Sequence, residues 1–164
     1  MEVRRARVDD AAAIAEVHVR TWQGAYAHVF GEERLAGVTA EGRLRIWREI
    51  LGGDRQSVFV CEEDGRLVGF CGVGAGRDDD ADGELHAIYV EPEAWGSGAG
   101  PALMQAGVEE LRAAGFADAI LWVLEDNPRA RRFYEREGWH LDGARREGEH
   151  LGVRTAEVRY RRAL

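Results

Sequence analysis

The chain has 164 residues, of which 45% are hydrophobic and 32% are charged, and its net charge is −8. These values are typical of one folded globular domain, which we expect to span residues 1–164 without an internal linker. The negative charge argues against a nucleic-acid partner, because a phosphate backbone is bound by clustered positive charge.

Targeting signals and reactive side chains are scarce. No apolar run approaches the roughly 20 residues that a membrane-spanning helix needs, and the N-terminus mixes acids with arginines, unlike a signal peptide. We therefore expect a cytoplasmic protein without a membrane partner. All 22 basic residues are arginines, so no lysine side chain can serve as a nucleophile or base. Cys61 and Cys71 lie in apolar runs, which favours buried thiols over a disulfide or a metal site.

The N-terminal half predicts a strand, two helical regions and three further strands. Alternating residues form the first strand, and Asp9 or Asp10 can cap the alanine-rich helix after it. The second helical region ends at a Gly-Gly pair, and a Glu-Asp-Gly turn joins the next two strands. The expected ranges are strands 2–8, 57–63, 66–76 and 83–90, and helices 11–27 and 32–51.

The C-terminal half alternates helices and strands. A glycine-rich segment leads into an amphipathic helix that ends at Gly115, and a strongly apolar strand follows. Asn127 and Pro128 are typical of a helix start, and Gly138 ends that helix. The expected ranges are helices 101–114 and 128–137, strands 117–125, 139–145 and 153–161, and a polar connection at 146–152.

The resulting order, β-α-α-β-β-β-α-β-α-β-β, predicts an α/β fold with a mixed sheet between helices. The last hairpin, which contains Val158 and Tyr160, is predicted to present an exposed edge through which a homodimer can form.

The segment EPEAWGSGAGPAL, residues 91–103, places Gly96, Gly98 and Gly100 directly before a helix. The first amides of a helix lack internal partners and attract anions, and glycine lets a bulky phosphate approach them. A tight connection without any ligand is the alternative. A dinucleotide-binding fold does not fit, because three or four strands precede the loop, and a P-loop does not fit, because no lysine exists.

YVEPEAWGSGAGPAL, residues 89–103, resembles the acetyl-coenzyme A motif of the GCN5-related N-acetyltransferases (GNAT). NPRARRFYEREGW, residues 127–139, is similar to the second signature of that family, at the right separation and in the right order. The resemblance covers essentially the whole chain. It implies a single GNAT-like domain whose mostly antiparallel sheet is flanked by helices on both faces and opens between its fourth and fifth strands. The chain departs from the family pattern at Trp95, where the family has Gln or Arg.

The resemblance implies acetyl-CoA as co-substrate and no metal. Loop amides would hold the diphosphate, with Arg131 or Arg132 assisting because Trp95 carries no charge. The backbone of β-strand residues Ile88 and Val90 would pair with the pantetheine arm. The residues implied in cofactor binding are Ile88, Tyr89, Val90, Trp95, Gly96, Ser97, Gly98, Ala99, Gly100, Pro101, Ala102, Asn127, Arg131 and Tyr134.

The implied reaction is direct acetyl transfer to a primary amine within a ternary complex. Tyr134 matches the tyrosine that gives a proton to the departing sulfur in the family. An alkyl amine has a pKa near 10.4, so a base is needed at neutral pH. Glu84 matches the catalytic glutamate of the histone-acetylating branch, and His86 lies two residues further along the same strand. Either residue, or only water, can fill this role.

The acceptor is expected to be an amine of a small molecule or a peptide. The residues predicted to contact it are Trp22, Tyr26, His28 and Glu84. The acidic loop with Asp78, Asp79, Asp80 and Asp82 would attract cationic acceptors. Two alternatives stay open: a catalytically silent acetyl-CoA sensor, and a transferase that uses another acyl-CoA.

Overall fold

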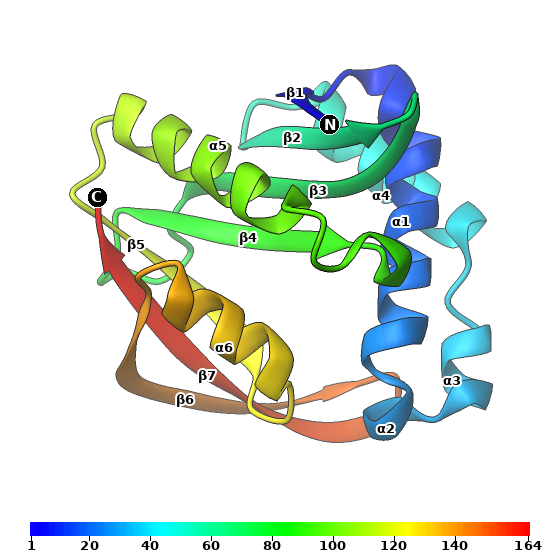
Figure 1. The fold of residues 1–164 in the computed structure, drawn as a ribbon. Coiled ribbons are helices and arrows are strands. Elements are labelled where there is room, and N and C mark those ends of the chain that lie inside the picture. Colours follow the sequence, from blue (N-terminus) through cyan, green and yellow to red (C-terminus); the bar gives the residue numbers. More distant parts are fainter.

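A computed structural model describes residues 1–164. Its seven strands form one sheet in the order β1-β2-β3-β4-β5-β7-β6 (Figure 1). All neighbouring strands are antiparallel except β4 and β5, which are parallel, so the predicted mixed sheet is confirmed. The strands are β1 (Glu2–Arg5), β2 (Gln56–Glu63), β3 (Arg66–Ala75), β4 (Gly83–Val90), β5 (Asp118–Leu124), β6 (His140–His150) and β7 (Val153–Ala163).

Helices cover both faces of the sheet, as predicted (Figure 1). α5 and α6 pack on one face, around Leu103, Tyr134 and Trp139. α1 and α4 pack on the other, where Ile14 and Trp47 meet Phe70. None of the helices is both long and apolar enough to cross a membrane. The helices are α1 (Ala11–Ala25), α2 (Ala27–Phe30), α3 (Glu32–Ala36), α4 (Ala40–Gly52), α5 (Ala99–Ala113) and α6 (Pro128–Arg136), with short 3-10 turns at Val8–Asp10 and Pro92–Ala94.

The sheet opens between β4 and β5. These two strands pair only at Gly83 with Ala119 and at Glu84 with Ile120, and they diverge beyond that point (Figure 1). From there on, the β5-facing edge of β4 has no strand partner. The opening that the sequence implied is therefore present, and Glu84 marks the position where it begins.

A β-bulge in β4 lies directly after this last pair. Gly72 of β3 pairs with Ala87 and Val73 pairs with Leu85, so His86 is the additional residue. A bulge changes which face the following side chains point to. As a result Leu85 packs in the core beneath α5, whereas Ala87 packs beneath α1 and α4.

The last hairpin differs from its prediction in two ways. Strand β6 continues to His150, and only Leu151 and Gly152, both with positive φ, form the turn. The predicted connection at 146–152 is therefore wrong for most of its length, because residues 145–150 all pair with β7 although most of them are exposed. Val158 and Tyr160 are buried on β7, an inner strand, so the exposed edge of this hairpin is its other strand, β6. A homodimer formed through this edge stays a prediction.

The acidic loop before β4 is tied to β7. Arg159 contacts Asp78 at 2.9 Å and Asp80 at 2.8 Å, and it also contacts Asp142 at 2.7 Å. The hydrogen bond from Arg159 holds the pKa of Asp80 below its ordinary value. Two of the four aspartates of the loop are thus paired within the chain, which removes about half of the negative charge expected to attract a cationic acceptor.

Both cysteines are buried and free, as expected. The thiol of Cys71 donates to the carbonyl of Leu103, and burial raises its pKa to about 12. A thiol with such a pKa stays protonated at neutral pH and is a poor nucleophile.

Candidate active site

The glycine segment forms a loop with three free amides at the start of α5. Gly96 has φ of 85° and Gly98 has φ of 98°, a region that favours glycine, and Gly98 directly precedes the helix. The amides of Gly96, Gly98 and Gly100 make no hydrogen bond within the chain. A Cβ at Gly96 would meet no atom within 4 Å, so the space beside this residue is open. The loop can therefore receive an anion.

The other predicted cofactor residues of the loop offer no free amide to a ligand. The amide of Ser97 donates to the carbonyl of Ala94 at 3.2 Å, and that of Ala102 donates to Gly98 at 3.1 Å. The amide of Ala99 contacts the Ser97 hydroxyl at 3.3 Å, and Pro101 has no amide hydrogen. The expectation that Ala102 lends its amide to a phosphate is wrong, because the first turn of α5 already uses it.

The free edge of β4 directs backbone groups into the opening. The amide of Glu91 donates to Val68 of β3 at 3.0 Å, so the carbonyl of Val90 points the other way, toward β5. Alternation along the strand gives Ile88 the same direction. Ile88 and Val90 thus present the groups predicted to pair with an extended arm. Tyr89 between them faces α1 and lies 5.4 Å from the ring of Phe70.

Trp95 closes one end of this edge. Its indole nitrogen donates to the carbonyl of Val90 at 2.7 Å, and the guanidinium of Arg129 lies over its ring, 3.4 Å from the centroid. Arg131 points elsewhere: its Nε donates to the hydroxyl of Tyr160 at 3.1 Å and its Nη1 to the carbonyl of Glu125 at 3.2 Å. Arg129 is the arginine of α6 that meets the loop, a contact the sequence did not predict.

Asn127 and Tyr134 lie where α6 faces the opening. The side-chain oxygen of Asn127 accepts from Ala130 and caps α6, as predicted, while its Nδ2 donates to the hydroxyl of Tyr26 at 3.2 Å. Tyr134 is buried, and its hydroxyl makes no hydrogen bond within the chain. Burial, with a smaller contribution from the phenols of Tyr26 and Tyr89, raises the pKa of Tyr134 above its ordinary value. Its hydroxyl therefore keeps its proton throughout the neutral pH range.

The two candidate bases differ in their surroundings. Glu84 is buried and accepts hydrogen bonds from the amide of Arg77 at 2.9 Å and from its guanidinium. Burial raises the pKa of Glu84, but the contacts with Arg77 outweigh it and the pKa is lowered. His86 lies 3.9 Å from Glu84, and its buried Nδ1 has no hydrogen-bond partner. Burial lowers the pKa of His86, partly offset by Glu84, so the imidazole is neutral at pH 7.

Three of the four predicted acceptor residues gather at the end of α1, whereas Glu84 lies apart from them on β4, bound to Arg77. The rings of Trp22 and Tyr26 lie 5.2 Å apart, and Phe30 stacks on Trp22 at 5.7 Å. Tyr26 and Phe30 are buried, whereas Trp22 is half-buried. His28 is exposed and bonds the backbone carbonyl of Asp126 at 3.0 Å, next to Asn127. The structure brings Trp22, Tyr26 and His28 to the side of the opening that faces α2.

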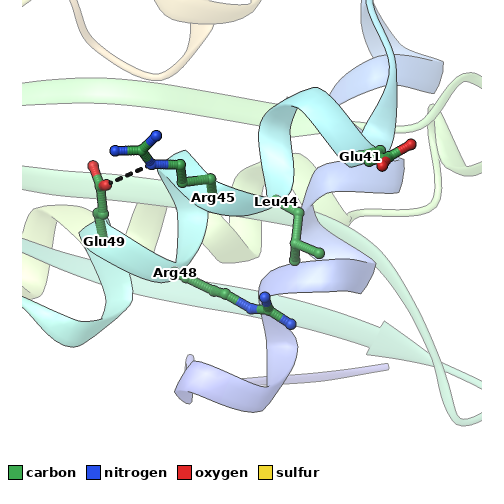
Figure 2. Close-up of a pocket in the computed structure, with 5 residues that line it drawn as sticks. All are labelled: Glu41, Leu44, Arg45, Arg48 and Glu49. Atoms are coloured by element: carbon green, nitrogen blue, oxygen red, sulfur yellow. Dashed lines mark hydrogen bonds and ion pairs between the residues drawn. The ribbon is translucent and has the colours of Figure 1, made fainter.

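Of two surface cavities, only one lies near the predicted site residues. One of about 390 Å³ lies on the outer surface of α4, between charged side chains of a single helix (Figure 2). It touches none of the predicted site residues. The other, of about 350 Å³, lies between α2, the end of β5 and the start of β7. Its lining residues are Val29, Leu124, Glu125, Asp126, Arg154, Thr155 and Ala156.

His18 is a half-buried group that no sequence motif identified. Its Nδ1 accepts from the indole of Trp47 at 3.2 Å, and its ring lies 5.2 Å from that of Tyr89. Burial, with a smaller contribution from Arg43, lowers its pKa from 6.5 to about 4. The sequence around His18 does not predict this lowered pKa, because the residues that bury its ring, such as Trp47 and Tyr89, belong to other elements.

This shift predicts that acid destabilises the fold. Between pH 6.5 and about 4 the unfolded chain binds a proton at His18 that the folded protein does not bind. The free energy of unfolding should therefore fall by about 3 kcal/mol as the pH falls through this window. His18→Asn, which keeps an acceptor for Trp47, should lose this part of the pH dependence in urea unfolding. The exposed control His140→Asn should keep it, and an unchanged pH dependence in His18→Asn would contradict the assignment.

Comparison with known proteins decides the family. The model of the acetyltransferase (GNAT) family matches residues 13–139, a range that includes β4, the glycine loop and α6. The chain belongs to the GNAT family of acetyltransferases. It is accordingly an acyltransferase, as the two signatures predicted.

Individual relatives agree with this assignment. YuaI of Bacillus subtilis, an uncharacterised N-acetyltransferase, is 34% identical to this acetyltransferase over 77% of the chain and 73% of its own length. A GCN5-related N-acetyltransferase from Rhodopseudomonas palustris has the same fold, with a TM-score of 0.80, 23% identity, and coverage of 99% of this chain and 95% of its own. YncA of Salmonella typhimurium, solved with acetyl-CoA, has a TM-score of 0.72 and 24% identity, and the match covers 100% and 94% of the two chains.

Proposed function

We propose that this acetyltransferase moves an acetyl group from acetyl-CoA to a primary amine of a small molecule or a peptide, by direct transfer within a ternary complex. The observation that carries the proposal is the set of free amides at Gly96, Gly98 and Gly100, continuous with the unpaired edge of β4. YncA, a structural neighbour, binds acetyl-CoA on the same fold. Family membership makes the same co-substrate the natural guest here.

The described residues fit coenzyme A chemically. Free amides at a helix N-terminus suit a diphosphate. Backbone groups of Ile88 and Val90 that face the opening suit the amides of a pantetheine arm, which would add to β4 as a strand does. The Val90 carbonyl already accepts from Trp95, so at that residue the amide is the group left for the arm.

Bound acetyl-CoA would supply the activated acetyl group as a thioester. His86 at the vertex of the opening would remove a proton from the attacking amine, directly or through water, and the carboxylate of Glu84, 3.9 Å from its Nδ1, would stabilise the imidazolium that forms. Tyr134 would give its proton to the sulfur as the carbon–sulfur bond breaks. Burial raises the pKa of both cysteine thiols, so neither would act as a nucleophile that carries the acetyl group.

The acceptor would approach from the side of α2. Trp22 and Tyr26 supply aromatic surface there, which suits an apolar or cationic group. The cavity beside Asp126 and Thr155 continues this surface, and the buried hydroxyl of Thr155 has no hydrogen-bond partner. Two carboxylates and one guanidinium at its rim would favour an acceptor that carries a cation and, beside it, an anion or hydrogen-bond acceptor.

A binding and turnover experiment tests the function. Titration calorimetry with CoA, acetyl-CoA, propionyl-CoA and succinyl-CoA should show binding, and thiol release should follow with some member of a panel of amines. Tight binding of acetyl-CoA without turnover on polyamines, amino acids, aminoglycosides and N-terminal peptides would favour the sensor. Preference for propionyl-CoA or succinyl-CoA would favour the alternative of a transferase for another acyl group. If the protein binds no CoA ester at millimolar concentration, the proposal is refuted.

Substitution of Gly96 separates phosphate binding from backbone strain. Gly96→Ala should lower the affinity for CoA about tenfold or more, because the loop must change shape or place a methyl group beside the free amides. Gly115 is a matched control: its φ of 83° resembles the 85° of Gly96, and a Cβ would meet no atom within 4 Å at either residue. Both variants should lose about 1–2 kcal/mol of stability. Equal CoA affinities in calorimetry would refute the loop assignment.

A further inference from the structure

Arg129 and Trp95 form a contact across the opening of the sheet. Trp95 follows β4, whereas Arg129 lies in the first turn of α6, after β5. The guanidinium carbon of Arg129 lies 3.4 Å from the centre of the Trp95 ring, within the range of a strong cation–π contact. The two separated halves of the sheet therefore meet at this pair.

The orientation of the ring is fixed. The indole nitrogen of Trp95 donates to the carbonyl of Val90 at 2.7 Å, which leaves the ring little freedom to rotate. Trp95 is half-buried and Arg129 is exposed, so the charged group lies at the surface of the opening. Stacking holds a guanidinium at low entropic cost while its N–H groups stay available.

The charge of Arg129 has no partner in the chain. No carboxylate forms an ion pair with it, in contrast to Arg131, which is held by Tyr160 and the Glu125 carbonyl. Its other neighbours on α6 include Arg132 and Arg136, which repel it. A fixed, unpaired cation among like charges attracts an anion. The free amides that begin at Gly96, the residue after Trp95, also attract anions.

We propose that Arg129, held on the ring of Trp95, binds the diphosphate of coenzyme A together with the free amides of the loop. In this chain the positive charge would thus come from α6, and Trp95 would act as the platform that positions it. Trp95 stands where Gln or Arg is usual in the family, and the arginine stacked on it restores the missing charge. The proposal rests on the proposed use of acetyl-CoA.

The test compares three probes in titration calorimetry: CoA, dephospho-CoA, which keeps the diphosphate, and pantetheine, which lacks it. Arg129→Gln should weaken CoA and dephospho-CoA by about tenfold or more, because a charge-assisted contact to phosphate is lost. The affinity for pantetheine should stay within about twofold of the wild-type value. Arg136→Gln, an exposed arginine on the same helix, should leave all three affinities unchanged.

A second substitution returns the charge to the loop. Trp95→Arg combined with Arg129→Gln should recover the CoA affinity to within about threefold of the wild type. Trp95→Leu alone should weaken CoA and dephospho-CoA but not pantetheine, because the platform is lost. A purely structural role would instead lower the affinity for all three probes together.

Several results would overturn the inference. These are an unchanged CoA affinity in Arg129→Gln, an equal loss for pantetheine, and a loss for CoA without one for dephospho-CoA, which would assign Arg129 to the 3′-phosphate. A wild-type protein that binds none of the three probes would refute the proposed co-substrate instead.

Discussion

Tyr134→Phe is expected to lower kcat by about 100-fold or more, while the affinity for acetyl-CoA changes by less than about threefold. The hydroxyl of Tyr134 makes no hydrogen bond within the chain, so its removal should cost little stability. Its pKa is raised by burial, so the wild-type phenol holds a proton to give at every neutral pH. Single-turnover thiol release with an amine found by the panel measures the effect.

Tyr160→Phe is the matched control. Its ring lies 6.1 Å from that of Tyr134, but its hydroxyl is already bound to Arg131 and Glu135. This variant should lose about 1 kcal/mol of stability and keep its turnover within about threefold. A Tyr134→Phe enzyme with full turnover would show that the departing sulfur takes its proton from another group.

His86→Gln is expected to lower kcat/KM for the acceptor by about 100-fold at pH 7. The imidazole is neutral there, because burial lowers its pKa, and its Nδ1 has no competing partner. Glu84 is the weaker base, since its contacts with Arg77 hold its pKa below the ordinary value. Glu84→Gln should instead cost about 2 kcal/mol of stability by leaving the guanidinium of Arg77 without its carboxylate.

The pH profile distinguishes the two bases. With His86 as base, activity corrected for amine protonation should fall only below pH 6.5, where the imidazole gains its proton. His86→Gln should lose this acid limb, whereas Glu84→Gln should shift it to lower pH, because a nearby carboxylate favours the imidazolium. Full activity in His86→Gln together with its loss in Glu84→Gln would reverse the assignment.

Local patterns in the sequence were sufficient for most of the fold. Period-two and period-3.6 spacing located most of the helices and strands, and glycine marked helix ends at Gly115 and Gly138. The strand predicted at 2–8 ends at Arg5, and the single helix predicted at 32–51 is two helices, α3 and α4. The end of β6 was missed because its residues are exposed on both faces, so no apolar alternation distinguishes them from a loop. The motifs were sufficient for the family and for the position of the anion loop.

Tertiary partners were beyond the reach of these patterns. No local sequence pattern indicates that Arg129 lies on Trp95 or that Arg77 binds Glu84. The same is true of the ion pairs of Arg159 with Asp78 and Asp80. Each pair joins residues from different elements, and with 22 arginines in the chain the sequence does not indicate which arginine binds which partner. The bulge at His86 is equally hidden, because strand alternation assumes an unbroken register.

The hydrogen bond between Asn127 and Tyr26 links two functions that the fold otherwise separates. Tyr26 ends the helix beside the expected acceptor, and Asn127 begins the helix beside the expected pantetheine arm. A ligand that draws the Asn127 amide away would release the Tyr26 hydroxyl at the same time. If binding of the co-substrate changes the affinity for the acceptor, binding of the acceptor must change the affinity for the co-substrate by the same factor. With Tyr26 and Asn127 in these expected roles, a single amide–phenol contact would couple the affinities for the two substrates.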